Sequence, residues 1–143
     1  MKIKLLDGGE APTKAHDEDT GFDLKARTSV LLKKNGGREL VPCGFKIDGK
    51  AGEGCDIQIR SRSGLALRDG VFVLNAPGTV DIGYRGEISV ILCNLSKSDY
   101  TVNVGDKVAQ MVIGKYVEDC NLEVVDSISD SARMDNGFGS SGK

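Results

Sequence analysis

The sequence of 143 residues contains no tryptophan, three prolines and a single histidine, His16. It also lacks any apolar run as long as a membrane span, so we expect no membrane-spanning segment. Lysines at positions 2 and 4 break up the first apolar residues, which argues against a signal peptide. We therefore expect an intracellular protein of the cytoplasm, and a nuclear, organellar or virus-encoded protein stays open.

An excess of one charge is also missing. The 19 basic residues nearly balance the 21 acidic ones and leave a formal net charge of −2. A general nucleic-acid binder needs a basic surface, so we expect no nucleic-acid partner. The cysteines form no CxxC pair, and one histidine cannot complete a zinc site with them. We expect four reduced, mostly buried thiols at positions 43, 55, 93 and 120.

Glycine is abundant, with 19 residues that separate short runs of β-forming residues. Residues 55–60 alternate apolar and polar side chains, the pattern of a half-buried strand. Further β-type runs span residues 71–74, 87–93, 100–104, 108–113 and 122–125. One short helical piece is expected at residues 64–68. A single domain with an all-β fold, a sandwich or a barrel, is the prediction.

The last residues of the chain differ in composition from the rest. Residues 127–143 are rich in Ser, Gly, Asp and Asn and cannot bury enough apolar surface to order themselves. We therefore expect a β domain over residues 1–126 and a flexible C-terminal tail over residues 127–143. The tail is either disordered or a segment that orders over a ligand, with Arg133 and Phe138 as its anchors.

A first candidate site is the segment RSGLA at residues 62–66, between an alternating strand and the short helix. Backbone N–H groups at a helix N-terminus favour a phosphate, and Gly64 allows close approach of the backbone. Ser63 adds a hydroxyl, and Arg62 adds a guanidinium that suits phosphate oxygens. The alternative is an ordinary serine cap beside a surface arginine.

A second candidate site is the Pro- and Gly-rich segment at residues 75–87, which two β-type runs flank as in a hairpin. A hairpin presents backbone donors and acceptors that can read the edge of a planar base. Asp81 could activate a water, and Tyr84 could pack against a sugar ring. The alternative makes Asp81 a turn residue and Tyr84 a core aromatic.

With these segments in view, the chain resembles the homotrimeric deoxyuridine triphosphate nucleotidohydrolase (dUTPase) family. Five short motifs of that family occur in order and together span residues 19–142. The matching segments are DTGFDLKA at 19–26, RSGLA at 62–66, GTVDIGYRGE at 78–87, GDKVAQ at 105–110, and Arg133 followed by GFGSSG at 137–142. The resemblance implies a distorted jelly-roll or β-sandwich fold of the dUTPase β-clip type, with one short helix.

The resemblance also implies a reaction, in which dUTP and water give dUMP and pyrophosphate. This reaction limits uracil incorporation into DNA and supplies dUMP for dTTP synthesis. Asp81 would be the base that activates the attacking water, and Gln110 would position that water or a phosphate oxygen. Mg²⁺ would be the cofactor, chelated by the triphosphate and held by Asp23 through water.

The remaining roles carried over from the family concern the substrate. The phosphate-binding residues would be Arg62, Ser63, Gly64, Gln110, Arg133, Gly139 and Ser140. The residues for uracil and deoxyribose would be Asn75, Gly78, Thr79, Val80, Asp81, Tyr84 and Phe138. The partner would be dUTP, and each site would be assembled between the subunits of a homotrimer, with the tail reaching over a neighbour's site.

Two alternative functions stay open beside the hydrolase. A dCTP deaminase, or a bifunctional deaminase–dUTPase, shares the fold but needs an acid/base group, normally a glutamate, beside C4 of the base. The segment at residues 81–84 offers none, and Glu87 lies farther along the chain. A non-catalytic regulatory protein of the same fold is the second alternative, and the intact candidate residues argue against it.

Overall fold

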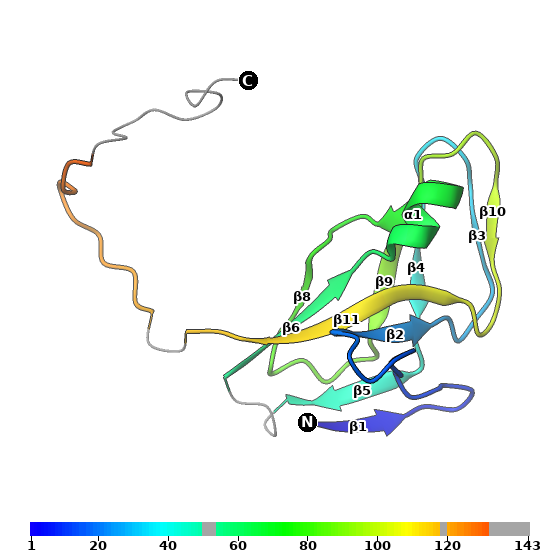
Figure 1. Ribbon diagram of the computed structural model, residues 1–143, viewed down its shortest axis with the longest axis horizontal. Coiled ribbons are helices and arrows are strands. Elements are labelled where there is room, and N and C mark those ends of the chain that lie inside the picture. The colour runs from blue at the N-terminus through cyan, green and yellow to red at the C-terminus, as the bar shows by residue number, and fades with distance from the viewer. Residues whose placement is uncertain (50–53, 118–119, 132–143) are drawn as a thin grey trace.

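The computed structural model describes residues 1–49, 54–117 and 120–131 of the chain. Almost all of its regular structure is β-strand (Figure 1). The elements are β1 (Lys2–Leu5), β2 (Gly21–Lys25), β3 (Val30–Leu32), β4 (Gly37–Pro42), β5 (Phe45–Asp48), β6 (Cys55–Arg60), α1 (Ser63–Asp69), β7 (Val71–Val73), β8 (Gly78–Val80), β9 (Ser89–Asn94), β10 (Tyr100–Val102) and β11 (Lys107–Lys115).

Two sheets form the body of the domain. One has four strands in the order β2-β11-β6-β8, and the other has three in the order β4-β9-β7. Two smaller antiparallel pairs, β1 with β5 and β3 with β10, complete the structure. Buried side chains of both main sheets belong to one hydrophobic core. The prediction of an all-β sandwich with one short helix is therefore confirmed.

The core follows the alternation that the sequence shows. Ile57 and Ile59 of β6 are 1% and 4% exposed, whereas the polar residues between and beside them point away from the core. Ile88, Val90 and Leu92 lie buried on one face, as the period of two predicts. Because a shift of one residue would turn these side chains to solvent, the pattern fixes the register of the sheets.

The expected hairpin of residues 71–93 has an unusual connection. β7 and β9 pair antiparallel, with Val73 opposite Leu92. The chain between them contributes β8 to the other sheet, where Val80 lies opposite Ile57. β8 is an edge strand, since its one neighbour in the sheet is β6. One side of its backbone is therefore left unpaired by the sheet.

The β-type prediction at residues 122–125 was wrong for the isolated chain. No strand is assigned in residues 120–131, and the side chains of Leu122 and Val124 are 97% and 99% exposed. A strand needs a neighbour to accept its hydrogen bonds. Figure 1 shows this segment leading away from the two sheets, in orange. The predicted tail begins here, but residues 132–143 lie outside the described part of the chain.

The cysteines are free, as predicted, but they differ in burial. Cys43 and Cys93 are buried, Cys55 is partly buried, and Cys120 is exposed. Burial, and to a smaller extent the negative charge of Glu87, raises the pKa of the Cys43 thiol to about 12. That thiol is therefore protonated at neutral pH. In the described ranges, no helix has the length and apolar character needed to cross a membrane.

Candidate functional site

A polar cavity of about 320 Å³ lies where β2, β11 and the start of α1 meet. The structure brings together five of the residues predicted to bind phosphate or metal. They come from three segments far apart in the sequence: Asp23, Arg62, Ser63, Gly64 and Gln110. Arg62 is the N-cap of α1 and has an extended backbone, and no side chain caps the helix. The alternative reading of this segment as a serine cap is therefore wrong.

Asp23 is the electrostatic centre of this cavity, which we call the polar cavity. Its carboxylate oxygens lie 3.1 Å from Arg62 Nε and 2.7 Å from Lys107 Nζ. Arg62 also donates a hydrogen bond from Nη1 to the carbonyl oxygen of Lys107, at 2.9 Å. Arg62 and Lys107 neutralise the charge of Asp23, and Asp19 also lines the cavity, so the guanidinium of Arg62 is the group that can attract a phosphate there. Sequence analysis assigned no role to Lys107.

The polar cavity has limited means of holding a metal ion. Within residues 1–49, 54–117 and 120–131, no group of three or more His, Cys, Asp or Glu side chains comes together. Asp23 is the acidic residue of the predicted set, and its carboxylate is 15% exposed. A single carboxylate suits Mg²⁺, which usually keeps several of its waters. The residues present therefore fit the prediction of an ion held through water rather than by a protein cage.

Gln110 is held in the polar cavity by its own hydrogen bond. Its Nε2 donates to the carbonyl oxygen of Ser61 at 2.9 Å. Gln110 lies on β11 between Arg60 of β6 and Asp23 of β2. The side chain passes directly over Gly21, where an added Cβ would collide with its amide oxygen and come within 3.2 Å of its Cβ. Gly21 therefore provides the space that Gln110 occupies.

Gly21→Ala is expected to destabilise the protein by about 1–3 kcal/mol, because the methyl group overpacks the site and displaces Gln110. Urea unfolding would measure the change. Gly114→Ala on β11 is the matched control, since an added Cβ there meets nothing within 4 Å. Equal unfolding midpoints for the two variants would contradict the packing argument.

A second cavity, of about 270 Å³, lies beside β8 and the turn that follows it. Seven residues were predicted to bind uracil and deoxyribose, and the structure brings together here all those that it describes. They are Asn75, Gly78, Thr79, Val80, Asp81 and Tyr84. Apolar side chains of both sheets, including Ile59 of β6 and Val73 of β7, also line it. We call this the β8 cavity.

The turn after β8 is braced by its own backbone and by Arg85. The N–H of Tyr84 donates to the carbonyl oxygen of Asp81 at 2.9 Å. Arg85 Nη1 donates to the carbonyl oxygens of Ile82 and Tyr84, at 2.7 and 2.9 Å. Asp81 is exposed, and Tyr84 is 47% exposed. Tyr84 is thus not a core aromatic, and both side chains are accessible to a ligand.

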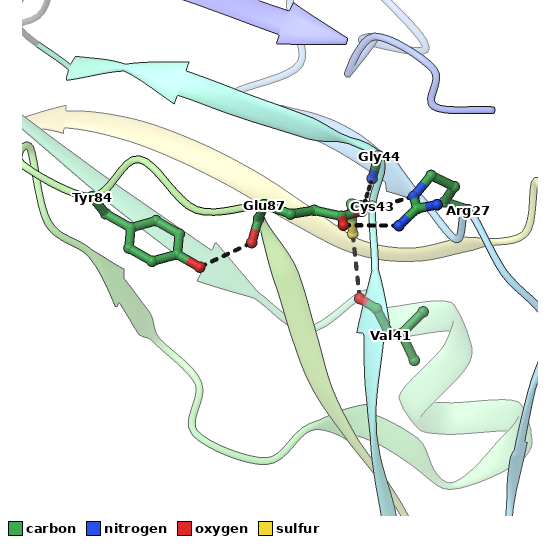
Figure 2. A network of polar contacts seen from close by, with 6 residues as sticks. All are labelled: Arg27, Val41, Cys43, Gly44, Tyr84 and Glu87. Carbon is green, nitrogen blue, oxygen red and sulfur yellow. Dashed lines mark hydrogen bonds and ion pairs between the residues drawn. The ribbon is translucent and has the colours of Figure 1, made fainter. Parts of the chain in front are cut away.

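Glu87 closes this segment with a network of polar contacts (Figure 2). Its carboxylate accepts two hydrogen bonds from Arg27, at 2.9 and 2.8 Å, and one from the N–H of Gly44, at 2.8 Å. The bond to Arg27 is the main reason that the pKa of Glu87 lies below its usual range. A carboxylate held ionised by three donors is poorly suited to proton transfer, which argues against a deaminase role for Glu87.

The two cavities are separate within one chain. Val80 of β8 lies opposite Ile57 of β6, and the two strands are antiparallel. Arg62 follows β6 at one end of this pair of strands, and Asp81 follows β8 at the opposite end. Arg60, the last residue of β6, lies three positions from Ile57, about 10 Å along the strand, and Arg62 and Asp81 continue beyond the two strand ends on opposite sides. Figure 1 likewise shows α1 and the loop after β8 toward opposite ends of β6. One chain therefore does not bring the predicted base to the predicted phosphate-binding residues.

Four predicted site residues lie outside the described residues. They all belong to the tail and are Arg133, Phe138, Gly139 and Ser140. The roles of the residues in the two cavities also stay predictions, because geometry alone shows where the side chains lie. Sequence analysis assigned no role to Arg27 or Lys107, which form ion pairs with the cavity-lining residues Glu87 and Asp23.

Comparison with known proteins gives consistent matches along the chain. Residues 7–142 match a protein family described as dUTPase. A deoxyuridine 5'-triphosphate nucleotidohydrolase of Clostridium tetani is 46% identical over 144 residues, covering 100% of this chain and 97% of that protein. The protein of the same name from Neorickettsia sennetsu is 48% identical over 145 residues, covering 99% and 95%.

Solved structures agree with the fold. A dUTPase of Staphylococcus bacteriophage 80alpha, solved with dUpNHpp, has a TM-score of 0.85 at 23% identity and covers 99% of this chain and 98% of its own. A dUTPase of phage phi11 of S. aureus has a TM-score of 0.78 at 20% identity, with 90% and 98% covered. That structure describes the coordination of a structural Mg(II) ion.

Proposed function

The chain belongs to the dUTPase family, and from this premise we propose that it hydrolyses dUTP to dUMP and pyrophosphate. The observation that carries the proposal is the edge strand β8 at its cavity. Its unpaired backbone side at residues 78–80 offers donors and acceptors to the edge of a uracil. Asn75 lies close enough to Gly78 that an added Cβ would come within 3.1 Å of its amide nitrogen, so its side chain can join this edge.

Base and sugar selectivity follow from this arrangement. Cytosine presents the opposite donor and acceptor pattern, and it would leave buried groups unpaired, which can discriminate by roughly 10⁴-fold or more. The tight segment around Thr79 and Val80 excludes the methyl group of thymine. Tyr84 packs under the deoxyribose and leaves no room for a 2′-hydroxyl, which rejects UTP.

Asp81 acts as the base. Its carboxylate can accept a proton from a water aligned with the α-phosphorus. Arg62, Ser63 and Gly64 bind the phosphate oxygens, and Gln110 positions the water or a neighbouring oxygen. Lys107, beside Asp23, adds positive charge to the same cavity.

The implied cofactor is Mg²⁺. When bound, it neutralises triphosphate charge that develops during phosphoryl transfer. Asp23 would hold the ion through water, since Arg62 and Lys107 already contact its two carboxylate oxygens. This role of Asp23 requires no additional acidic residue.

Each active site is shared between chains of a homotrimer. Asp81 and Arg62 line different cavities of one chain, which supports the proposal that a neighbouring chain supplies one of them to each site. Exposed apolar side chains support such contacts. Leu40 and Ile91 lie opposite each other, 61% and 37% exposed, and Leu122 is 97% exposed.

The tail closes over the substrate. Phe138 stacks on the uracil, which by analogy with other base-stacking sites contributes about 1–3 kcal/mol. Arg133, Gly139 and Ser140 contact the distal phosphates. Such a lid would close over bound dUTP and open for product release. Because the proposed substrate and product belong to the nucleotide pool, the protein works inside the cell, in the cytoplasm.

The proposed activity predicts rapid release of pyrophosphate from dUTP and little from dCTP, dTTP or UTP. The assay uses Mg²⁺, with EDTA as the metal-free arm, because removal of the ion should abolish most turnover. An ammonia assay with dCTP runs beside it. Ammonia release would establish the deaminase, and failure to turn over any of the four nucleotides would favour a non-catalytic regulatory protein.

A further inference from the structure

The contacts of Glu87 join three segments that are distant in the sequence. Arg27 follows β2, Gly44 lies in the corner between β4 and β5, and Glu87 ends the segment that carries Asp81 and Tyr84. The guanidinium of Arg27 binds both carboxylate oxygens, and the Gly44 N–H binds one of them (Figure 2). The side chains of Arg27 and Glu87 are 29% and 21% exposed, so this ion pair is largely shielded from water.

Both partners of the pair are fixed in place by the backbone around them. The N–H of Arg27 donates to the carbonyl oxygen of Pro42 at 2.8 Å. Gly44 has a φ of 76°, and an added Cβ there would come within 2.9 Å of Arg27 Cδ. The corner therefore fits closely around the arginine side chain, and the two-point contact leaves Glu87 little freedom to move.

Glu87 is in turn connected to Tyr84. The Tyr84 hydroxyl donates to the backbone carbonyl oxygen of Glu87 at 3.1 Å, as Figure 2 shows. The ring folds over Gly86 so closely that an added Cβ would collide with the hydroxyl oxygen. Because Tyr84 is 47% exposed, core packing contributes little to holding the ring, and its hydroxyl contact matters more.

We propose that the Arg27–Glu87 pair is a positioning element for Tyr84, and that it thereby sets the discrimination between deoxyribose and ribose. The inference rests on the proposed function, in which Tyr84 lies under the sugar. Arg27 does not line the β8 cavity, and Glu87 does, but its carboxylate is bound by Arg27 and Gly44. The pair fixes the carbonyl oxygen of Glu87, that oxygen fixes the Tyr84 hydroxyl, and the ring then occupies the space that a 2′-hydroxyl would require.

The competing interpretation gives the pair a purely structural role. It would then hold the corner of β4 and β5 together and contribute to stability alone. The two interpretations differ in one measurable quantity, the ratio of kcat/KM for dUTP to kcat/KM for UTP. A structural clamp leaves this ratio unchanged, whereas a positioning element changes it because Tyr84 gains freedom to make room for ribose.

The test uses Glu87→Gln, which keeps the shape but removes the charge, and Arg27→Lys, which keeps the charge but removes the two-point contact. We expect Glu87→Gln to lower the ratio roughly tenfold, and Arg27→Lys roughly threefold, because displacement by a fraction of an ångström is costly at such sites. Asp99→Asn is the matched control. Asp99 also binds a cation, Lys33 at 2.9 Å, and a backbone N–H, that of Lys34 at 3.0 Å.

Different measurements test the proposed hydrolase activity and the positioning role of the Arg27–Glu87 pair. Hydrolysis of dUTP by the unaltered protein decides the proposed function. Given that activity, a lowered melting temperature with an unchanged dUTP-to-UTP ratio in Glu87→Gln would overturn the positioning role. If Glu87→Gln does not fold, the same criterion applies to Arg27→Lys. The relative affinities for dUMP and UMP give a second readout of the same ratio without turnover.

Discussion

Asp81→Asn is expected to lower kcat for dUTP by roughly 10²–10⁴-fold and to leave substrate affinity within about threefold of the original value. The amide cannot accept the proton of the attacking water, so the contribution of general-base catalysis is lost. The shape of the β8 cavity is kept, because asparagine is nearly isosteric and Asp81 is exposed in its turn. Pyrophosphate release measures the first effect, and calorimetric binding of an imido analogue of dUTP measures the second.

Asp48→Asn is a suitable control for that experiment. Asp48 is also exposed, and it lies 3.5 Å from Arg85, so it approaches the same turn from outside the β8 cavity. Its substitution should leave kcat within about twofold, as expected for a surface change. Full activity of Asp81→Asn would refute the assignment of the base. A parallel loss of binding would indicate that Asp81 mainly holds the substrate.

Mixed trimers of two inactive variants are expected to regain activity. If Asp81 and Arg62 of one site come from different chains, then trimers that combine Asp81→Asn with Arg62→Ala contain some sites with both original residues. Random mixing predicts that about a quarter of all sites are intact, because each of two chains must contribute its unaltered residue. The variants would be mixed by co-expression, and activity would be compared with each variant alone.

The control for this mixing experiment uses two variants of the polar cavity. Arg62 and Gln110 line the same cavity of one chain, so a chain that carries either substitution contributes a defective cavity. Mixtures of Arg62→Ala with Gln110→Ala should therefore stay inactive. Native mass spectrometry would verify that the mixed trimers form. No recovery in verified mixtures of Asp81→Asn with Arg62→Ala would mean that the site is not shared in this way.

Patterns within a few neighbouring residues predicted single strands and the short helix. The alternation at residues 55–60 predicted β6 with its correct bounds, and the short helix was expected at residues 64–68 within α1. Both signals come from side chains a few positions apart. The motif at residues 78–87 likewise predicted a set of residues that the structure gathers in one cavity.

Contacts between distant segments could not be predicted in this way. Arg27 and Glu87 are 60 positions apart, and Lys107 meets Asp23 where the register of β11 against β2 shifts. No periodicity encodes such pairs, because they depend on which strands become neighbours. The incorrect prediction of a strand at residues 122–125 has a related cause. Its apolar side chains predict a neighbouring strand, and within the described part of the chain no strand is assigned at residues 122–125.

The edge position of β8 also bears on how this protein can vary in evolution. If main-chain atoms at residues 78–80 read the base, as proposed, recognition depends more on the path of the backbone than on the side chain of Thr79. Thr79 is exposed, and most replacements there would leave the backbone groups in place. Proline is the exception, since it removes an N–H donor. Selectivity for the base would then depend on the conformation of the backbone, so it can be retained while many of the surrounding side chains change.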